Sequence, residues 1–102
     1  MEACLQCVAA CNHCASSCLK EKDVKMMVSC IQLDMECAAV CYNAAQLMSL
    51  GSTRADALCR LCAEICADCA GECSKHDNDH CRECANACHK CAEECMQMTE
   101  QA

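Results

Sequence analysis

The segment CRECANACHKCAEEC at residues 81–95 has a cysteine at every third or fourth position. The same spacing of 3, 4, 3 and 4 residues recurs in CLQCVAACNHCASSC at 4–18 and in CRLCAEICADCAGEC at 59–73. An α-helix places residues with this spacing on one stripe, whereas a strand would distribute them over both faces. The repeat therefore predicts three helices, each with a row of cysteines along one side.

A fourth segment has an interrupted form of the same stripe. Steps of 4 and 3 residues through its cysteines connect Met27, Cys30, Asp34, Cys37, Cys41, Ala44 and Met48. Asp34 and Ala44 stand where cysteines would continue the row. The chain has no proline and is rich in alanine, glutamate, glutamine and methionine, which favour helices. We therefore predict helices at about 2–20, 23–49, 53–75 and 79–99.

The breaks between the predicted helices contain helix-end signals. Gly51 is suited to end the second helix, because glycine readily adopts the left-handed conformation found after helix C-termini. Candidate N-caps are Asp23, Thr53 with Asp56 in an approximate capping box, and Asn78 or Asp79. Short connections make successive helices antiparallel neighbours. We predict an all-α fold, a single domain over residues 1–102 that forms an antiparallel up-down-up-down four-helix bundle with a cysteine-lined core.

The composition restricts the partners and the location of the chain. Its 102 residues include 18 cysteines, 2 glycines and a single aromatic residue, so alanine and cysteine supply most of the apolar content. The net charge of -7 and the lack of basic patches interleaved with aromatics argue against a nucleic-acid partner. No apolar run has the length of a membrane span. The opening MEACLQCVAAC lacks the positive charge and apolar stretch of a signal peptide, so we expect a cytoplasmic protein.

Several roles for so many thiols conflict with their number and regularity. Cysteine can fill a core as a small apolar residue, but alanine, valine or leucine would pack more stably without the risk of oxidation. Structural disulfides are rare in a reducing cytoplasm, and they need only a few pairs of cysteines. Ferredoxin-type iron–sulfur motifs need a C-x-x-C-x-x-C loop and a following Cys-Pro, whereas this chain has helical spacing and no proline.

A thiolate metal store fits the pattern better, because soft thiolates select Cu(I) or zinc. A zinc ion bound by four thiolates keeps two negative charges, which are costly to bury several times. Cu(I) accepts two or three thiolates, and one ion per thiolate replaces one proton and leaves the core neutral. The residues favour storage of multiple Cu(I) ions, with a Zn(II) buffer or a thiol/disulfide redox protein as alternatives. The sequence has no catalytic triad or phosphate loop, so we do not expect an enzyme.

The repeated C-x-x-C-x-x-x-C-x-x-C-x-x-x-C pattern on short helices resembles the bacterial copper storage proteins, a family of cysteine-rich four-helix bundles, and the lack of an export signal resembles its cytosolic branch. The resemblance covers nearly the whole chain. It implies a homotetramer of bundles that stores Cu(I) on core thiolates for copper homeostasis, detoxification or supply. The ligands that it implies are Cys4, Cys7, Cys11, Cys14, Cys18, Cys30, Cys37, Cys41, Cys59, Cys62, Cys66, Cys69, Cys73, Cys81, Cys84, Cys88, Cys91 and Cys95.

Antiparallel order brings further possible copper ligands to the two ends of the bundle. One end gathers Met26, Met27, His76 and His80, and the other gathers Met1, Met48, Met96 and Met98. We expect copper to load at the histidine end, in part because the family has histidines at its copper entrance. The added ligands expected there are His76, His80, Met27 and Asp34. The alternatives are solvated loop histidines and methionines that only fill space, and His13 and His89 are expected at the surface.

The second predicted helix differs from the others in its polar and apolar faces. Asp34 lies within the cysteine stripe, where it could accept hydrogen bonds from thiols, ligate copper, or turn outward through a small rotation of the helix. An adjacent apolar line contains Val24, Val28, Ile31, Met35 and Tyr42. We expect this side to contact another subunit, which makes the chain a homo-oligomer and, according to the resemblance, a tetramer.

Overall fold

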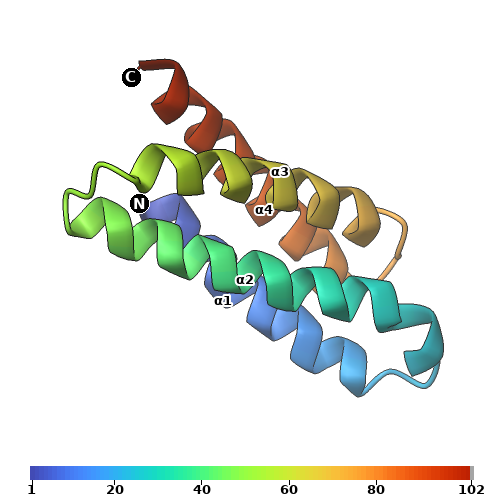
Figure 1. Ribbon diagram of the computed structural model, residues 1–102. Helices are drawn as coiled ribbons and strands as arrows, with labels where there is room; N and C mark the ends of the chain where they lie inside the picture. Colours follow the sequence, from blue (N-terminus) through green and yellow to red (C-terminus); the bar gives the residue numbers. More distant parts are fainter. Residues whose placement is uncertain (102) are drawn as a thin grey trace.

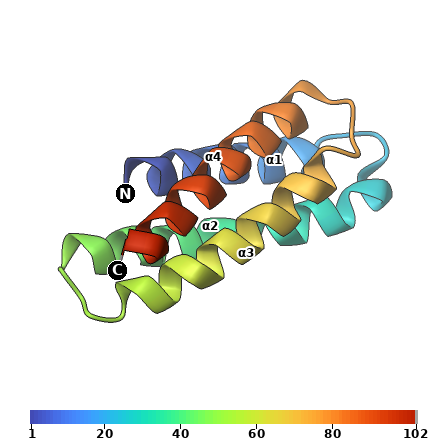
Figure 2. The same ribbon diagram turned by 90° about the horizontal axis from the view of Figure 1, so that it is seen from above.

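Four α-helices form an elongated bundle in the computed structural model, which describes residues 1–101 and the side chains of residues 1–98. The elements in chain order are α1 (Glu2–Leu19), the 3₁₀-helix η1 (Val24–Met27), α2 (Val28–Ser49), α3 (Ala55–Cys73) and α4 (Asp79–Gln101). Successive helices run in opposite directions, and α1 and α3 each lie beside both α2 and α4 (Figure 1, Figure 2). The bundle measures 44 × 19 × 17 Å. The predicted four-helix bundle is confirmed.

The second predicted helix forms in two parts. We expected one helix over 23–49, but the chain first forms η1 and becomes α-helical at Val28. The N–H of Met26 donates to the carbonyl of Asp23 (2.9 Å), whereas the Asp23 side chain makes no capping bond. Such tighter turns are common at the N-termini of α-helices. This turn leaves Met26 exposed and buries Met27 against the core.

Gly51 ends α2, as predicted. Its φ is 66°, its N–H donates to the carbonyl of Met48 (3.1 Å), and the N–H of Ser52 donates to the carbonyl of Leu47 (3.0 Å). This pair of bonds is a Schellman motif, which satisfies carbonyls that the helix end would otherwise leave without intrahelical partners. A side chain with a Cβ would be strained at this φ, so the glycine supports the turn that returns the chain along α2 as α3.

The start of α3 differs from its prediction. The expected capping box of Thr53 with Asp56 is wrong, because α3 begins at Ala55 and its N-cap, Arg54, makes no side-chain capping bond. The hydroxyl of Ser52 accepts a hydrogen bond from the N–H of Arg54 instead (3.1 Å). The turn between α2 and α3 is therefore tied to the helix start by a serine that the sequence pattern did not single out.

Thiols and small side chains fill the core of the bundle. All eighteen cysteines are buried, and the neighbouring alanines allow the helices to approach closely. Sulfur atoms meet even across the diagonals of the bundle: Cys7 of α1 lies 4.0 Å from Cys66 of α3, and Cys37 of α2 lies 3.9 Å from Cys88 of α4. The four rows of side chains consequently form one continuous column of thiols.

The surface of the bundle has an apolar side on α2. Val28, Met35 and Tyr42 are 59, 62 and 56 % exposed, and Ile31 is partly buried beside them. This arrangement confirms that apolar residues cover the outer side of α2 as well as its inner side. Among the helices of the described residues, none combines the length and the hydropathy that a membrane crossing requires.

Candidate metal centre

The rows of cysteines converge into one network of reduced thiols. None of the eighteen cysteines, which all lie within the described residues, forms a disulfide. Among contacts between helices, the sulfurs of Cys37 and Cys66 and those of Cys41 and Cys62 are both 3.4 Å apart, and the contact between Cys7 and Cys66 spans 4.0 Å. These separations are far longer than the disulfide bond of about 2.0 Å. The sulfurs therefore contact one another without covalent links.

Cysteines four residues apart on one helix form a second set of contacts. Their sulfurs are 3.8 or 3.9 Å apart in five pairs, Cys7 with Cys11, Cys14 with Cys18, Cys37 with Cys41, Cys62 with Cys66 and Cys84 with Cys88. At a metal–sulfur bond length of about 2.3 Å, three sulfurs around one ion lie about 4.0 Å apart and two opposite sulfurs about 4.6 Å apart. The core thus holds its sulfurs close to the spacing that a metal bound by two or three thiolates requires.

Groups of four thiols follow one another along the bundle and share members. The donor atoms of each group all lie within 4.8 Å of one another. Four such groups are Cys4, Cys62, Cys91 and Cys95; Cys7, Cys41, Cys66 and Cys91; Cys7, Cys11, Cys37 and Cys88; and Cys11, Cys69, Cys84 and Cys88. Each group shares at least one cysteine with the next. This continuity suits metal ions bridged by common thiolates better than separate four-coordinate zinc sites, in which the ligands belong to one ion.

Burial and hydrogen bonding limit how many of these thiols can ionise. Burial, together with the charge of nearby Cys30, raises the pKa of Cys18 and raises that of Cys81 to about 11. Hydrogen bonds from Cys14 and Cys73 lower the pKa of Cys30. A thiolate is therefore stabilised only where its neighbours stay protonated, because a second thiolate beside it would repel the first. A cation that binds several thiolates must displace protons from the core.

Asp34 enters the column of thiols from α2. It is fully buried, and its Oδ1 accepts hydrogen bonds from the thiols of Cys69 and Cys84 (both 3.2 Å) and of Cys73 (3.6 Å). Its Oδ2 lies 3.8 Å from the thiol of Cys30. Burial raises the pKa of this carboxyl to about 10, so Asp34 is neutral near pH 7. The expected hydrogen bonds from thiols are confirmed, and the alternative of an outward-turned Asp34 is wrong.

His80 joins the cysteines at the end of the bundle beside the turn between α1 and α2. Its Nδ1 lies 3.5 Å from the sulfurs of Cys14 and Cys81 and 3.9 Å from the sulfur of Cys18. These four residues form another group whose donor atoms lie within 4.8 Å of one another. The His80 side chain is 12 % exposed and belongs to the first turn of α4, so it is not a solvated loop residue. It gives this end a mixed sulfur and nitrogen donor set at the boundary between solvent and core.

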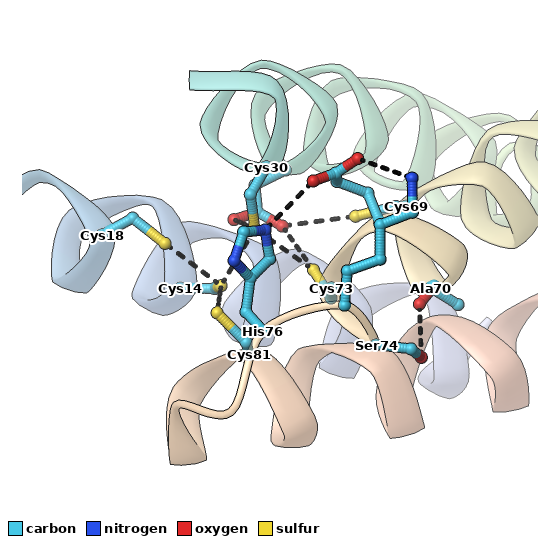
Figure 3. A network of polar contacts seen from close by, with 12 residues as sticks. Cys14, Cys18, Cys30, Cys69, Ala70, Cys73, Ser74, His76 and Cys81 are labelled. Atoms are coloured by element: carbon cyan, nitrogen blue, oxygen red, sulfur yellow. Dashed lines mark hydrogen bonds and ion pairs between the residues drawn. The ribbon is translucent and has the colours of Figure 1, made fainter. Parts of the chain in front are cut away.

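His76 lies at the same end but has a different partner. Its Nε2 is 3.0 Å from Oε2 of Glu72, four residues earlier, so among the described residues its hydrogen bond is to a carboxylate and not to a sulfur. Met27 is also buried at this end. Figure 3 draws His76 with the cysteines that α1, α2, α3 and α4 contribute there, namely Cys14, Cys18, Cys30, Cys73 and Cys81.

Two residues beside His80 were not recognised as partners from the sequence. Oε1 of Glu21 lies 3.0 Å from Nε2 of His80 and accepts a hydrogen bond from Nδ2 of Asn78 (2.9 Å). Asn78 was predicted as an N-cap, and its carbonyl does accept the N–H of Cys81 (3.1 Å), but its side chain turns to Glu21. Glu21 is 59 residues from His80 in the sequence and lies in a turn, so no helical spacing connects the two.

The opposite end of the bundle has thiols but no histidine among its described residues. Cys4 lies 3.8 Å from Cys95 and 3.6 Å from Cys91. Three of the methionines expected at this end, Met1, Met96 and Met98, are exposed, whereas Met48 is partly buried against the core. His13 and His89 are exposed on the sides of the bundle, as predicted.

The comparisons with known proteins agree with this picture of a thiol column. Residues 1–100 match the family described as copper storage protein. The chain is 48% identical over 80 residues to the uncharacterized cysteine-rich protein YhjQ of Bacillus subtilis, which covers 78% of this chain and 74% of that protein.

Two solved structures extend the likeness to nearly the whole chain. The Cu(I)-bound copper storage protein BsCsp3 superposes with a TM-score of 0.93 at 48% identity, over 96% of this chain and 92% of that one. A cytosolic copper storage protein from Streptomyces lividans, described as loading copper and holding five coppers, gives a TM-score of 0.94 at 38% identity, over 97% of this chain and 88% of that one.

Proposed function

This chain belongs to the copper storage protein family, and we propose that it stores multiple Cu(I) ions on the thiolates of its core in the bacterial cytoplasm. The observation that carries the proposal is the continuous column of eighteen buried thiols with shared four-donor groups. The copper-loaded state of two similar proteins supports Cu(I) as the cargo, and the cytosolic relative supports the location.

Charge explains how one narrow column can hold many ions. When a thiol binds Cu(I), the S–H bond breaks, the proton leaves to solvent and an S–Cu bond forms, so each step is neutral overall. Four thiolates around Zn(II) would instead retain two negative charges for each ion. Repeating that excess along a buried column is costly, because opposing charge is not available inside it. We therefore propose Cu(I) and not Zn(II) as the stored metal.

We propose all eighteen cysteines as Cu(I) ligands and His80 as the additional ligand at the end where copper loads. His80 presents a nitrogen to three sulfurs at the margin of the core, which is where an ion from solvent first meets thiols. His76 and Met27 lie at the same end and are proposed as outer contacts of the incoming ion. Asp34, whose oxygens contact four thiols, is proposed to take part in binding one step further along the column.

The two alternative functions fit the core less well. Thiol/disulfide exchange requires an accessible thiolate of low pKa, whereas each cysteine here is at most 2 % exposed. A zinc buffer would place separate tetrahedral sites along the column, whereas the observed groups share their thiols. Storage involves binding and release and no catalysed reaction, so the family role supports a protein that is not an enzyme.

We propose that the chain forms a homo-oligomer, a tetramer, through the outer side of α2. Val28, Met35 and Tyr42 are exposed on this side and would be buried by another copy. Light scattering coupled to size-exclusion chromatography should give four times the mass of one chain. Tyr42→Glu should dissociate the assembly without lowering the copper content of each chain, and a monomeric wild type would contradict this proposal.

Titration of the reduced protein with Cu(I) under anaerobic conditions tests the storage function. A competing Cu(I) chelator and a parallel titration with Zn(II) complete the experiment. Tight uptake that approaches one Cu(I) for each cysteine, with the helical content unchanged, is expected. Saturation after one or two Cu(I) ions would contradict the storage function, and tight uptake of one Zn(II) for every four thiols would favour a zinc buffer.

A further inference from the structure

Glu21 connects the end of α1 to the start of α4. Its carboxylate receives one hydrogen bond from Nδ2 of Asn78 (2.9 Å) and one from Nε2 of His80 (3.0 Å), both through Oε1. The Glu21 side chain is 36 % exposed, whereas that of His80 is 12 % exposed, so the contact lies at the margin between solvent and the thiol column. A glutamate carboxyl at such a partly exposed position is ionised near neutral pH.

This contact decides which nitrogen of His80 carries hydrogen. An ionised carboxylate only accepts hydrogen bonds, so the short contact requires a hydrogen on Nε2. A neutral imidazole has one N–H, and Nδ1 is therefore left with its lone pair. Nδ1 is the nitrogen that lies 3.5 Å from the sulfurs of Cys14 and Cys81. The ring thus presents its metal-binding atom to the thiols.

We propose that Glu21 is a positioning residue for copper loading, because it holds the His80 ring with the lone pair of Nδ1 directed at the thiols of Cys14, Cys18 and Cys81. This inference rests on the proposed function, since it concerns the end at which Cu(I) enters. A carboxylate that receives the second N–H of a metal-binding histidine fixes the tautomer and the orientation of the ring. Without Glu21 the ring can rotate, or it can carry its hydrogen on Nδ1, where a metal ion cannot bind.

The contact between His76 and Glu72 provides a matched control within the same end of the bundle. The two contacts have the same chemistry and the same length of 3.0 Å. His76 and Glu72 lie on one helix, however, and the described hydrogen bonds of the His76 ring do not reach a sulfur. Removal of the Glu72 carboxylate therefore changes the local charge to the same extent without affecting the orientation of His80.

The test compares Glu21→Gln, Glu21→Ala and the control Glu72→Gln. Nitrogen-15 NMR of the reduced protein without copper should show His80 in the Nε2–H form in the wild type and in Glu72→Gln, and a mixture of both tautomers in the Glu21 variants. Transfer of Cu(I) from a chelator should be slower in Glu21→Ala by up to roughly tenfold, the limit set by loss of His80 itself, with a smaller change in Glu21→Gln, whose amide oxygen can still accept a hydrogen bond. Loading of Glu21→Ala at the wild-type rate would overturn the proposal.

Two further readouts separate this role from a general effect on folding or on storage. In the His80→Ala background, Glu21→Ala should cause no additional slowing, and an equal slowing there would overturn the inference. The final number of Cu(I) ions should be the same in all variants, because the cysteines are intact. If the wild type stores copper but the Glu21 variants behave like it, only this inference fails, whereas a wild type that takes up no copper contradicts the proposed function.

Discussion

The two ends of the thiol column contain different donors. Beside the turn between α1 and α2, His80 shares a group with Cys14, Cys18 and Cys81. At the opposite end Cys4 and Cys95 belong to an all-cysteine group. An imidazole nitrogen with a free lone pair can bind Cu(I) without losing a proton, whereas a buried thiol cannot. Under the proposed function, this difference predicts that the His80 end captures Cu(I) faster than the opposite end.

Both ends contain thiols that must lose protons to bind Cu(I). A change of pH tests this requirement, and it should have the largest effect. Each Cu(I) that replaces a thiol proton should bind about tenfold more weakly for every unit by which the pH falls. Burial raises the pKa of Cys18 and Cys81, so this competition should extend across neutral pH. Competition titrations against a chelator at about pH 6 and about pH 8 measure it. An affinity that does not change with pH would contradict proton displacement.

Replacement of His80 should have the next largest effect, and it distinguishes the two ends. His80→Ala should slow transfer of Cu(I) from a chelator by roughly tenfold, because the first ion then meets only protonated thiols. Met48→Leu at the opposite end and His89→Ala on the surface are the controls, and both should load at the wild-type rate. Stopped-flow spectroscopy of the copper–chelator complex gives the rates. Equal slowing by Met48→Leu would remove the distinction between the ends.

Asp34 makes the part of the column near the His80 end sensitive to pH even without copper. Its pKa rises from an ordinary value of 3.8 to about 10, so between these values the folded chain keeps a proton that the unfolded chain releases. The stability attributable to this proton is fully present below pH 3.8 and is lost as the pH rises, by up to about 1.4 kcal/mol for each pH unit.

The variant Asp34→Asn keeps the size of the side chain and removes its titration. Denaturant unfolding of the reduced protein at about pH 5 and about pH 8 should show a smaller loss of stability with rising pH in the variant than in the wild type. His89 is exposed on α4, so His89→Gln serves as a control that should keep the wild-type dependence. An unchanged dependence in Asp34→Asn would show that Asp34 is ionised in the folded protein.

The smallest expected effect concerns the two positions where α2 departs from the cysteine pattern. Asp34 and Ala44 are both fully buried on the inner side of α2. Asp34→Cys and Ala44→Cys should each raise the capacity by about one Cu(I), because each adds one thiolate to the column. Anaerobic titration with elemental analysis measures the change. A gain at only one of the two positions would show that the two halves of the column differ in capacity as well as in donors.

Much of the fold follows from the spacing of the cysteines alone. Steps of three and four residues place every cysteine on the inner stripe of its helix, and the structure buries all eighteen. Gly51 was also recognisable from the sequence, because few residues other than glycine adopt its φ of 66°. Periodicity and backbone preference are local properties, and each of these predictions depended on them.

The features that the sequence did not reveal depend on contacts between distant segments. The partnership of Glu21 with His80 joins residues 59 positions apart, and the carboxylate lies in a turn without any periodic pattern. The spacing placed Asp34 in the cysteine stripe, but the choice between its inward and outward orientations depends on thiols from α3 and α4 that donate to it. The 3₁₀ turn η1, which the periodicity did not predict, ends at Met27, a residue buried in the core. Contacts between distant segments decided the partnership of Glu21 and the orientation of Asp34, which the local pattern left open.

Native mass spectrometry of the reduced protein during stepwise addition of Cu(I) tests whether copper replaces protons throughout the thiol column. It counts the bound ions and the hydrogens lost in the same measurement. We expect a series of species that extends toward eighteen ions, each step adding the mass of one copper and removing that of one hydrogen. A series that stops after one or two ions, or steps that add copper without loss of hydrogen, would contradict storage in a neutral thiolate core.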